Sequence, residues 1–334
     1  MVFLLLCGLG WAQTQTPAPS TPQNPPGASP DKKTDDPSAK GAQQSNGDDL
    51  TSAGTIKVTV PEVNLIFTVT DKHGRFIKDL TQNEFRVLDN NKPPKEIRDF
   101  KAQTDLPLRI GLLIDASNSI RDRFLFEQQA AIEFLQQTIR RDRDKAFVLA
   151  FDEVPEVTQD FTNDKDLLTK GVKLIRPGGG TAMWDAVFYA CRDKLMKLKE
   201  DTPVRRVIVL VSDGDDNQSR VLRQEAIDMA QRANVLIYTI STNLSNIKDS
   251  GDHNLGVLAE ATGGRPFFPY KLQDLADDFN EIQGELRSQY SIFYKPDDLI
   301  ANGQFRNVQI SPENKKFKVR AKKGYFAPKV GTQN

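Results

Sequence analysis

Three separate segments of this sequence carry side chains that could bind a metal ion through oxygen. Asp115, Ser117 and Ser119 occupy alternate positions in DASNS, at the end of an apolar run. Thr181 follows three glycines in RPGGGT, and Asp213 ends a second apolar run, VIVLVSD. Together these residues offer two carboxylates and three hydroxyls. Because Mg²⁺, Mn²⁺ and Ca²⁺ prefer oxygen ligands, whereas zinc favours His or Cys, the set indicates a hard divalent ion.

The pattern of apolar residues predicts the elements that must bring these segments together. Continuous apolar runs, namely RIGLLID, AFVLAFD, RVIVLVSD and VLIYTI, alternate with helical stretches. Such runs are typical of strands covered on both faces, as in a parallel sheet between helices. Helical spacing follows the first run, at Leu125, Ile132, Leu135 and Ile139. The sequence therefore predicts a doubly wound, mostly parallel α/β domain over residues 105–286.

The position of the polar residues within this predicted fold has a functional meaning. In an open parallel sheet, ligands bind beyond the carboxyl ends of the strands, where loops from different strands meet. Asp115 and Asp213 each end a predicted strand, and Thr181 precedes a predicted helix. We therefore expect the three segments to meet at one edge of the sheet.

Short alternating strands are predicted on both sides of the α/β domain. Those before it are IKVTV, VNLIFTVTD, EFRVLD and EIRDFKA, and those after it are SQYSIFYKP, FRNVQISP and KFKVRAKKGYFAP. Neither group alone makes a sandwich core, but together they have the strand count of a small immunoglobulin-like sandwich. We expect residues 55–104 and 287–328 to form one β-sandwich into which the α/β domain is inserted, followed by a tail at 329–334.

The first 54 residues are expected to lie outside both domains. Residues 1–12, MVFLLLCGLGWA, form a short apolar run that ends in small residues, as an export signal does. No positive charge precedes the run, so the signal is atypical or its start lies upstream, and the run is too short to span a bilayer. Residues 13–54 contain almost no large apolar side chain, which predicts a disordered linker. The chain is therefore predicted to be exported, to the periplasm, the cell surface or the medium.

Composition argues against several other classes of protein. The 45 basic residues balance the 45 acidic ones, so no net charge favours nucleic acid or an anionic membrane. Two cysteines, Cys7 and Cys191, cannot supply a disulfide framework or a cysteine metal site. His73 and His253 lie in polar segments, and no GxSxG motif accompanies them. We therefore expect no enzyme.

The polar segments have other interpretations besides a metal site. Gly178–Gly180 could bind phosphate, but no GK[ST] follows these glycines. DGDDN at 213–217 imitates the start of a calcium loop, yet the required glycine and glutamate are out of register, which favours a solvated acidic turn. Asp152 and Asp216 remain candidates for additional carboxylates near the site. Each Asp or Ser taken singly could simply cap a helix, but the set favours a metal site.

In this order, the three segments resemble the metal-ion-dependent adhesion site of von Willebrand factor type A domains. DASNS, GGGT and the aspartate of LVSDG carry the resemblance, and the layout is similar to exported bacterial proteins of this group. The resemblance implies hydroxyl ligands at Ser117, Ser119 and Thr181. It also implies that Asp115 and Asp213 act mainly through metal-bound waters.

The function that this resemblance implies is cation-dependent protein binding and adhesion. An acidic side chain of a partner protein would complete the coordination of Mg²⁺, so that the ion joins two macromolecules and no bond is broken. The alternative is a structural or assembly protein of the bacterial envelope in which the metal site stabilises the fold. The sequence identifies neither the partner nor the oligomeric state.

Overall fold

The computed structural model describes residues 62–102, 106–121, 123–243, 247–271 and 273–329. All of them belong to one unit of the chain, Val58–Asn334. The predicted export signal, the predicted linker, the strand expected at IKVTV and residues 330–334 of the predicted tail lie outside the described residues. Among the helices that are described, none combines the length and the apolar composition needed to cross a membrane.

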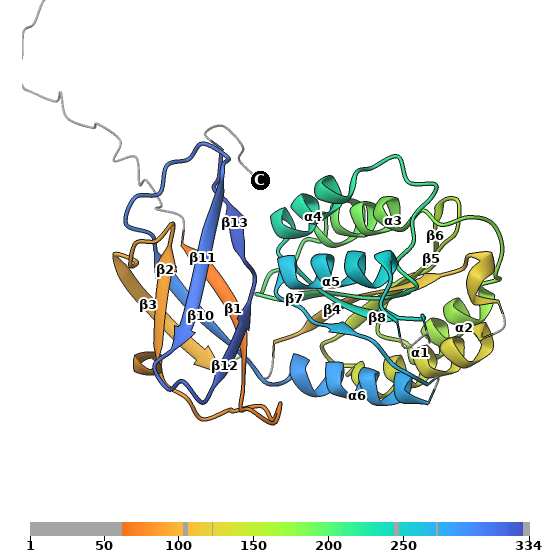
Figure 1. Ribbon diagram of the computed structural model, residues 1–334, viewed down its shortest axis with the longest axis horizontal. Coiled ribbons are helices and arrows are strands. Elements are labelled where there is room, and N and C mark those ends of the chain that lie inside the picture. Colours follow the sequence, from red (N-terminus) through yellow and green to blue (C-terminus); the bar gives the residue numbers. More distant parts are fainter. Residues whose placement is uncertain (1–61, 103–105, 122, 244–246, 272, 330–334) are drawn as a thin grey trace, which may run out of the picture. The chain divides into compact units, whose positions relative to one another are not determined.

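A six-stranded sheet, counted over the described residues, lies at the centre of the α/β part, in the order β6-β5-β4-β7-β8-β9 (Figure 1). The strands are β4 (Leu108–Asp115), β5 (Lys145–Phe151), β6 (Pro155–Thr162), β7 (Arg205–Ser212), β8 (Val235–Ser241) and β9 (Pro266–Phe267). Neighbouring strands are parallel except for β6, which is antiparallel to β5. Every residue of β4 and of β8 is buried, as expected for strands that are apolar at nearly every position.

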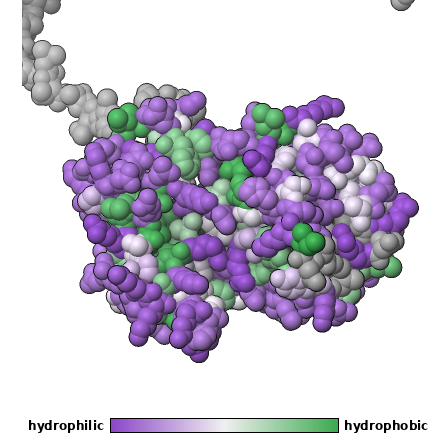
Figure 2. Space-filling model, in the orientation of Figure 1, coloured by the Kyte–Doolittle hydropathy of each residue, from purple (hydrophilic) through white to green (hydrophobic). Residues whose placement is uncertain are grey.

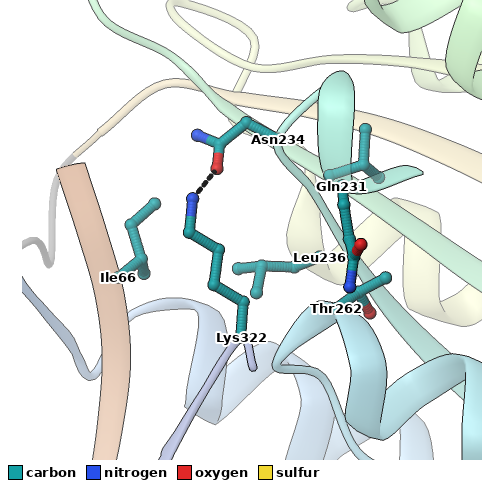
Figure 3. A pocket seen from close by; sticks show the side chains of 7 residues that line it. Ile66, Gln231, Asn234, Leu236, Thr262 and Lys322 are labelled. Carbon is teal, nitrogen blue, oxygen red and sulfur yellow. Dashed lines mark hydrogen bonds between the residues drawn. The ribbon is translucent and has the colours of Figure 1, made fainter. Parts of the chain in front are cut away.

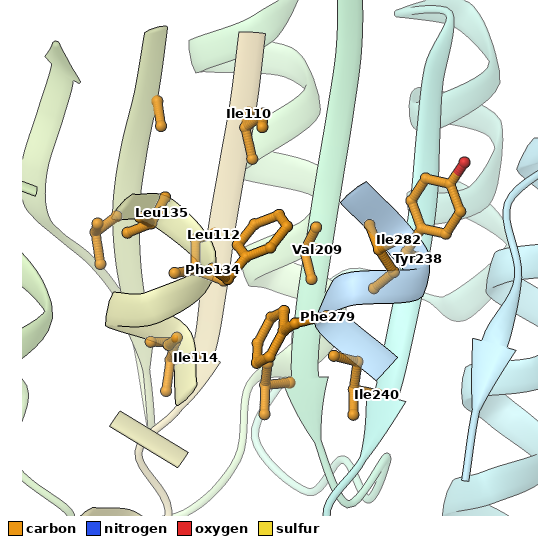
Figure 4. Close-up of a cluster of buried hydrophobic side chains, with 14 of the residues drawn as sticks. Ile110, Leu112, Ile114, Phe134, Leu135, Val209, Tyr238, Ile240, Phe279 and Ile282 are labelled. Carbon is orange, nitrogen blue, oxygen red and sulfur yellow. The ribbon is translucent and has the colours of Figure 1, made fainter. Parts of the chain in front are cut away.

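Helices cover both faces of this sheet. On one face, the apolar side chains of α1 (Phe124–Thr138), α2 (Lys165–Leu174) and α6 (Asp274–Leu286) pack in one cluster (Figure 4). The other face is covered by α3 (Met183–Tyr189), its π-helical continuation η3 (Ala190–Leu195), α4 (Arg223–Arg232) and α5 (Ser250–Thr262). The prediction of a doubly wound, mostly parallel α/β fold is confirmed.

One prediction about α1 was wrong in detail. Leu125 was placed on the apolar face of the helix, but its side chain is 78% exposed. The buried face of α1 runs through Phe124, Glu127 and Ala131, and Leu125 lies outside it, about 100° around the helix from Phe124. Leu125 therefore points away from the core.

The segments on either side of the α/β part form two antiparallel sheets. One has the order β12-β1-β10-β3, from β1 (Val63–Thr70), β3 (Glu96–Ala102), β10 (Gln289–Lys295) and β12 (Lys318–Ala321). The other has the order β13-β11-β2, from β2 (Phe85–Asp89), β11 (Phe305–Pro312) and β13 (Gly324–Phe326). A short 3₁₀ helix, η1 (Gln82–Glu84), precedes β2. Each sheet combines strands from before and after the α/β part, and their buried residues share one apolar cluster.

The junction between the β-sandwich and the α/β part is held by a buried carboxylate. Glu285, near the end of α6, is fully buried and accepts hydrogen bonds from Thr68 of β1 (3.2 Å) and the Tyr238 hydroxyl (2.8 Å). Arg320 of β12 forms an ion pair with the same carboxylate. Strands from both flanks are thereby tied to the last helix of the α/β part.

A small pocket lies beside this junction. Figure 3 shows Ile66 and Lys322 on one side of it and Asn234 and Leu236 on the other, with the Lys322 Nζ donating to Asn234 Oδ1 at 2.8 Å. Elsewhere, hydrophilic residues predominate on the face drawn in Figure 2, with hydrophobic patches scattered among them.

Candidate metal centre

The polar segments leave the sheet where its strand order reverses. From β4 the chain passes to β5 and β6 on one side, and it returns to β7 on the other side of β4. DASNS extends the end of β4 and leads into the 3₁₀ helix η2 (Asn118–Ile120), while Asp213 directly follows β7. Loops at such a switch point leave a crevice at the carboxyl edge of the sheet, which is where ligands bind in doubly wound folds.

A continuous chain of hydrogen bonds joins the first and third segments. The Ser119 hydroxyl donates to Asp213 Oδ2 at 2.7 Å, and the Ser117 and Ser119 hydroxyl oxygens lie 2.9 Å apart. Because Ser119 has a single hydroxyl proton and gives it to Asp213, Ser117 is the donor to Ser119. Two hydroxyls and a carboxylate from sequence positions nearly a hundred residues apart therefore meet at one point.

Asp115 forms the floor of this arrangement. Its carboxylate is fully buried and accepts hydrogen bonds from the Ser117 amide at 2.8 Å and the Ser212 hydroxyl at 2.6 Å. Burial raises the pKa of Asp115 to about 6, although these two serines oppose the shift. Ser119, by contrast, is exposed, so the site runs from a buried carboxylate to an accessible hydroxyl.

The backbone of the glycine-rich segment forms hydrogen bonds with the DASNS segment and with the segment after β7. The Gly178 amide donates to the Ala116 carbonyl at 2.6 Å, and Gly179, with a positive φ of 74°, accepts from the Asn118 amide at 3.4 Å. The Thr181 amide donates to Asn217 Oδ1 at 2.9 Å, and the Asn217 amide donates back to the Thr181 carbonyl at 3.0 Å. These contacts place the Thr181 loop between the DASNS loop and the loop after β7.

The additional carboxylates considered from the sequence support loops in this structure. Asp216 accepts from the Trp184 amide at 3.1 Å and from the Ser219 hydroxyl at 2.6 Å, which caps the start of α3. Asp152 accepts from the Val154 amide through its side chain, at 3.3 Å, and from the Ala182 amide through its backbone, at 2.6 Å. Within DGDDN, the side chains of Asp216 and Asn217 therefore support loops.

Sequence reasoning missed two supporting residues, Ser212 and Asn217, and one buried carboxylate, Glu127. Ser212 could have been found as the polar residue that ends the apolar run VIVLV. Glu127 lies on the buried face of α1, 2% exposed, with Arg123 Nε 3.3 Å from its carboxylate. Burial raises the pKa of Glu127 to about 8, and the charges of Asp115 and Asp213 add to the shift.

The donor set fits a hard divalent ion. Hydroxyl and carboxylate oxygens converge at the rim, which is the chemistry that Mg²⁺, Mn²⁺ and Ca²⁺ prefer. Within the described ranges, no group of three or more His, Cys, Asp or Glu residues is arranged to hold a metal ion. The oxygens of Ser117, Ser119 and Asp213 are ligands of the kind that these ions prefer, whereas zinc favours His and Cys.

Comparison with known families agrees with the fold. The model of the von Willebrand factor type A domain matches residues 110–285. An uncharacterized protein of Borreliella burgdorferi is 27% identical over 128 residues, which is 36% of this chain and 36% of that protein. The match thus spans little more than a third of that relative's length.

Several solved structures are similar to part of this chain at low identity. An aerotolerance-related membrane protein from Bacteroides fragilis is 16% identical, covering 54% of this chain and 98% of that one, with a TM-score of 0.44. The vWF domain of the type V pili tip protein Mfa5 from Porphyromonas gingivalis is 14% identical, covering 54% and 94%, with a TM-score of 0.43. Proximal thread matrix protein 1 from the mussel byssus, with a zinc-occupied MIDAS motif, is 15% identical, covering 60% and 50%, with a TM-score of 0.48. Likenesses this distant carry no argument about function.

The family assignment rests on the match to the family model. That match covers more than half of the chain and contains all five predicted site residues. The parallel sheet and the meeting of the loops after β4 and β7 agree with it. This chain belongs to the von Willebrand factor type A domain family.

Proposed function

We propose that this protein is a divalent-cation-dependent protein-binding module. The metal, Mg²⁺ in the first instance, is held by Asp115, Ser117, Ser119, Thr181 and Asp213. The observation that best supports the proposal is the hydrogen-bonded series Ser117–Ser119–Asp213, which gathers oxygen donors from two loops at an accessible rim. A bound cation would supply a coordination position for an acidic side chain of a partner protein.

The chemistry of the donors favours an external ligand. Hydroxyl groups are neutral, so Ser117, Ser119 and Thr181 leave much of a dication's charge uncompensated. Asp115 is held below them by Ser212 and the Ser117 amide, where a partner cannot reach it. Because Ser119 is exposed, a partner's carboxylate can approach from the solvent side. These residues orient and bind, and no bond has to be broken.

The buried cysteine and the N-terminal segment extend the proposal. We infer no thiol chemistry at Cys191, because this residue is fully buried and burial raises the pKa of its thiol. The apolar start of the chain and the polar segment after it favour export to the periplasm, the cell surface or the medium.

The proposal is tested by calorimetric titration of the full chain with Mg²⁺, followed by a synthetic peptide that contains one glutamate. We expect wild-type protein to bind Mg²⁺ and to bind the peptide only when Mg²⁺ is present. Asp213→Ala should lose both activities, whereas Asp142→Ala, at an exposed aspartate in the turn before β5, should keep both.

The same titration separates the alternative of a metal site that only stabilises an envelope protein. In that case Mg²⁺ would raise the unfolding temperature of the wild type and not of Asp213→Ala, while no carboxylate ligand would bind at any Mg²⁺ concentration. Peptide binding that survives a chelator would contradict the metal bridge itself.

A further inference from the structure

A groove lies beside the proposed metal site, between the start of α1 and the end of α2. Figure 1 shows these two helices next to each other. Its volume is about 500 Å³, within the range of sites that bind ligands or peptide side chains. Its lining combines apolar and basic side chains: Arg121, Phe124, Leu125, Lys173, Ile175 and Arg176. We call it the α1–α2 groove.

The walls of the α1–α2 groove continue directly into the loops of the metal site. Arg121 follows Ser119 by two residues, and its amide donates to the Asn118 carbonyl at 3.4 Å. Pro177, on the opposite wall, precedes Gly178, whose amide binds the Ala116 carbonyl at 2.6 Å. Since one extended residue spans about 3.3 Å, a partner segment of a few residues can reach from the rim into the groove.

Exposed apolar side chains gather around this groove. Leu125 is 78% exposed, although it lies next to the buried Phe124 and Ile175. A second hollow shares Ile175 and contains Leu174, 62% exposed, and Val154, 64% exposed. Single exposed apolar residues are common on soluble proteins, but here three of them line two hollows that share Ile175 and Arg176.

The charges of the groove select the kind of partner. Arg121, Lys173 and Arg176 are exposed, and the residues that line the α1–α2 groove include no acidic side chain in the described part of the chain. The Arg176 guanidinium donates to the carbonyls of Lys173 at 2.6 Å and Ile175 at 2.9 Å, so it is fixed at the end of α2. Because the whole chain has no net charge, this basic cluster is a local feature that attracts acidic groups.

We propose that the α1–α2 groove binds an extended segment of the partner protein that carries both apolar and acidic side chains. An apolar side chain of the segment packs on Leu125 and Ile175, and an acidic side chain faces Arg121 and Lys173. The segment's metal-binding carboxylate lies at the rim a few residues away. This inference rests on the proposed function and specifies the chemistry of its partner.

The test is selection of a random-peptide display library on the full chain in Mg²⁺, followed by affinity measurements with an enriched peptide. We expect enriched peptides to place an apolar residue within a few positions of two acidic residues. Leu125→Asp should weaken the peptide about tenfold or more, because an apolar contact is lost and a like charge is introduced. Lys173→Glu should weaken it severalfold and reduce its dependence on salt.

A matched variant controls for the substitution itself. Leu222 is 68% exposed and directly precedes α4, which covers the other face of the sheet. Aspartate is a favourable residue both before a helix and in its first turn, so Leu222→Asp and Leu125→Asp make the same kind of change at a helix start. Leu222→Asp should keep the wild-type peptide affinity. Titration with Mg²⁺ alone should give the wild-type affinity in both leucine variants, which shows that the metal site is intact.

The two proposals fail in different ways. If Leu125→Asp and Lys173→Glu both bind an Mg²⁺-dependent peptide as tightly as the wild type, the groove proposal is overturned and cation-dependent binding stands. If the library yields no Mg²⁺-dependent peptide, the proposed function is contradicted and the groove proposal is overturned with it.

Discussion

Buried carboxylates occur both at the metal-site rim and at the junction with the β-sandwich, but their partners differ. At the junction side, Glu285 is paired with Arg320, and Asp144 accepts from Arg287 at 2.6 Å. At the rim, Asp115 accepts from a backbone amide and from the Ser212 hydroxyl. Both Glu285 and Asp115 are fully buried. The difference lies in the charge of the donors.

This difference separates a structural site from a binding site. Removing a carboxylate from water is costly, and an adjacent guanidinium offsets the cost within the protein itself. At the junction, guanidinium groups of the fold itself supply this charge, so the ion pairs serve to hold two parts together. At the rim, serine hydroxyls offset less of the charge, which leaves the carboxylates available to an external cation. Four predictions test the contrast.

The largest effect is expected from Glu285→Ala. Removing this carboxylate leaves Arg320 and Tyr238 without their buried partner, which should lower the free energy of unfolding by about 3–5 kcal/mol. Denaturant unfolding measures the change. Glu281→Ala, on the same helix with an exposed pair to Arg265, is the control and should differ little from wild type. Equal effects of the two variants would remove the distinction between a buried and an exposed pair.

At the rim, the sharpest variant is Ser212→Ala. The Ser212 hydroxyl donates a hydrogen bond to the buried Asp115 carboxylate. Loss of a hydrogen bond that orients a metal-site carboxylate typically weakens metal binding about tenfold to a hundredfold. Titration with Mg²⁺ measures the affinity. The control is Ser241→Ala, because Ser241 is the register partner of Ser212 on β8 and is equally buried, but its hydroxyl donates to Asp252. Unchanged Mg²⁺ affinity in Ser212→Ala would show that Asp115 needs no such support.

Asp278 on α6 tests what happens to a partly buried carboxylate without a close cationic partner. Burial raises its pKa from 3.8 to about 7, with Glu281 adding to the shift. The folded state therefore prefers the protonated form, and stability is lost as the pH rises from about 4 through 7.

Asp278→Asn removes that loss. Allowing for solvent screening of a half-exposed group, we expect the variant to be more stable than wild type by about 1–2 kcal/mol at a pH near 8. The gain should vanish near pH 4, where the wild-type carboxyl is protonated in the folded protein. Asp277→Asn, on the exposed side of the helix, is the control. A gain that does not vary with pH would refute the titration of Asp278 as its cause.

The smallest effect is expected from Lys323→Ala. Its pair with Glu260 also joins the sandwich to the α/β part, but both side chains are more than half exposed. An exposed pair of this kind contributes less than about 1 kcal/mol. Thermal unfolding should place the variant close to wild type. A loss as large as that of Glu285→Ala would mean that the junction depends on the number of ion pairs and not on their burial.

Much of the fold could be predicted because its signals are local. Runs that are apolar at nearly every position predicted β4, β7 and β8, and the positions of the polar segments at strand ends predicted that they meet at one edge. The placement of Leu125 was wrong because helical spacing does not show which residues of a face meet another element. The buried face of α1 runs through Phe124, Glu127 and Ala131, which leaves Leu125 exposed to solvent.

The sequence by itself determined the kinds of oxygen donors and the strands that carry them, because alternation and apolar runs depend on neighbours in the chain. The tertiary structure alone decided what holds those donors in place. Ser212 reaches Asp115 across 97 positions and Asn217 reaches Thr181 across 36, distances over which no local pattern operates. Such partners are selected by the packing of parallel strands side by side, which brings the ends of distant segments within hydrogen-bond range.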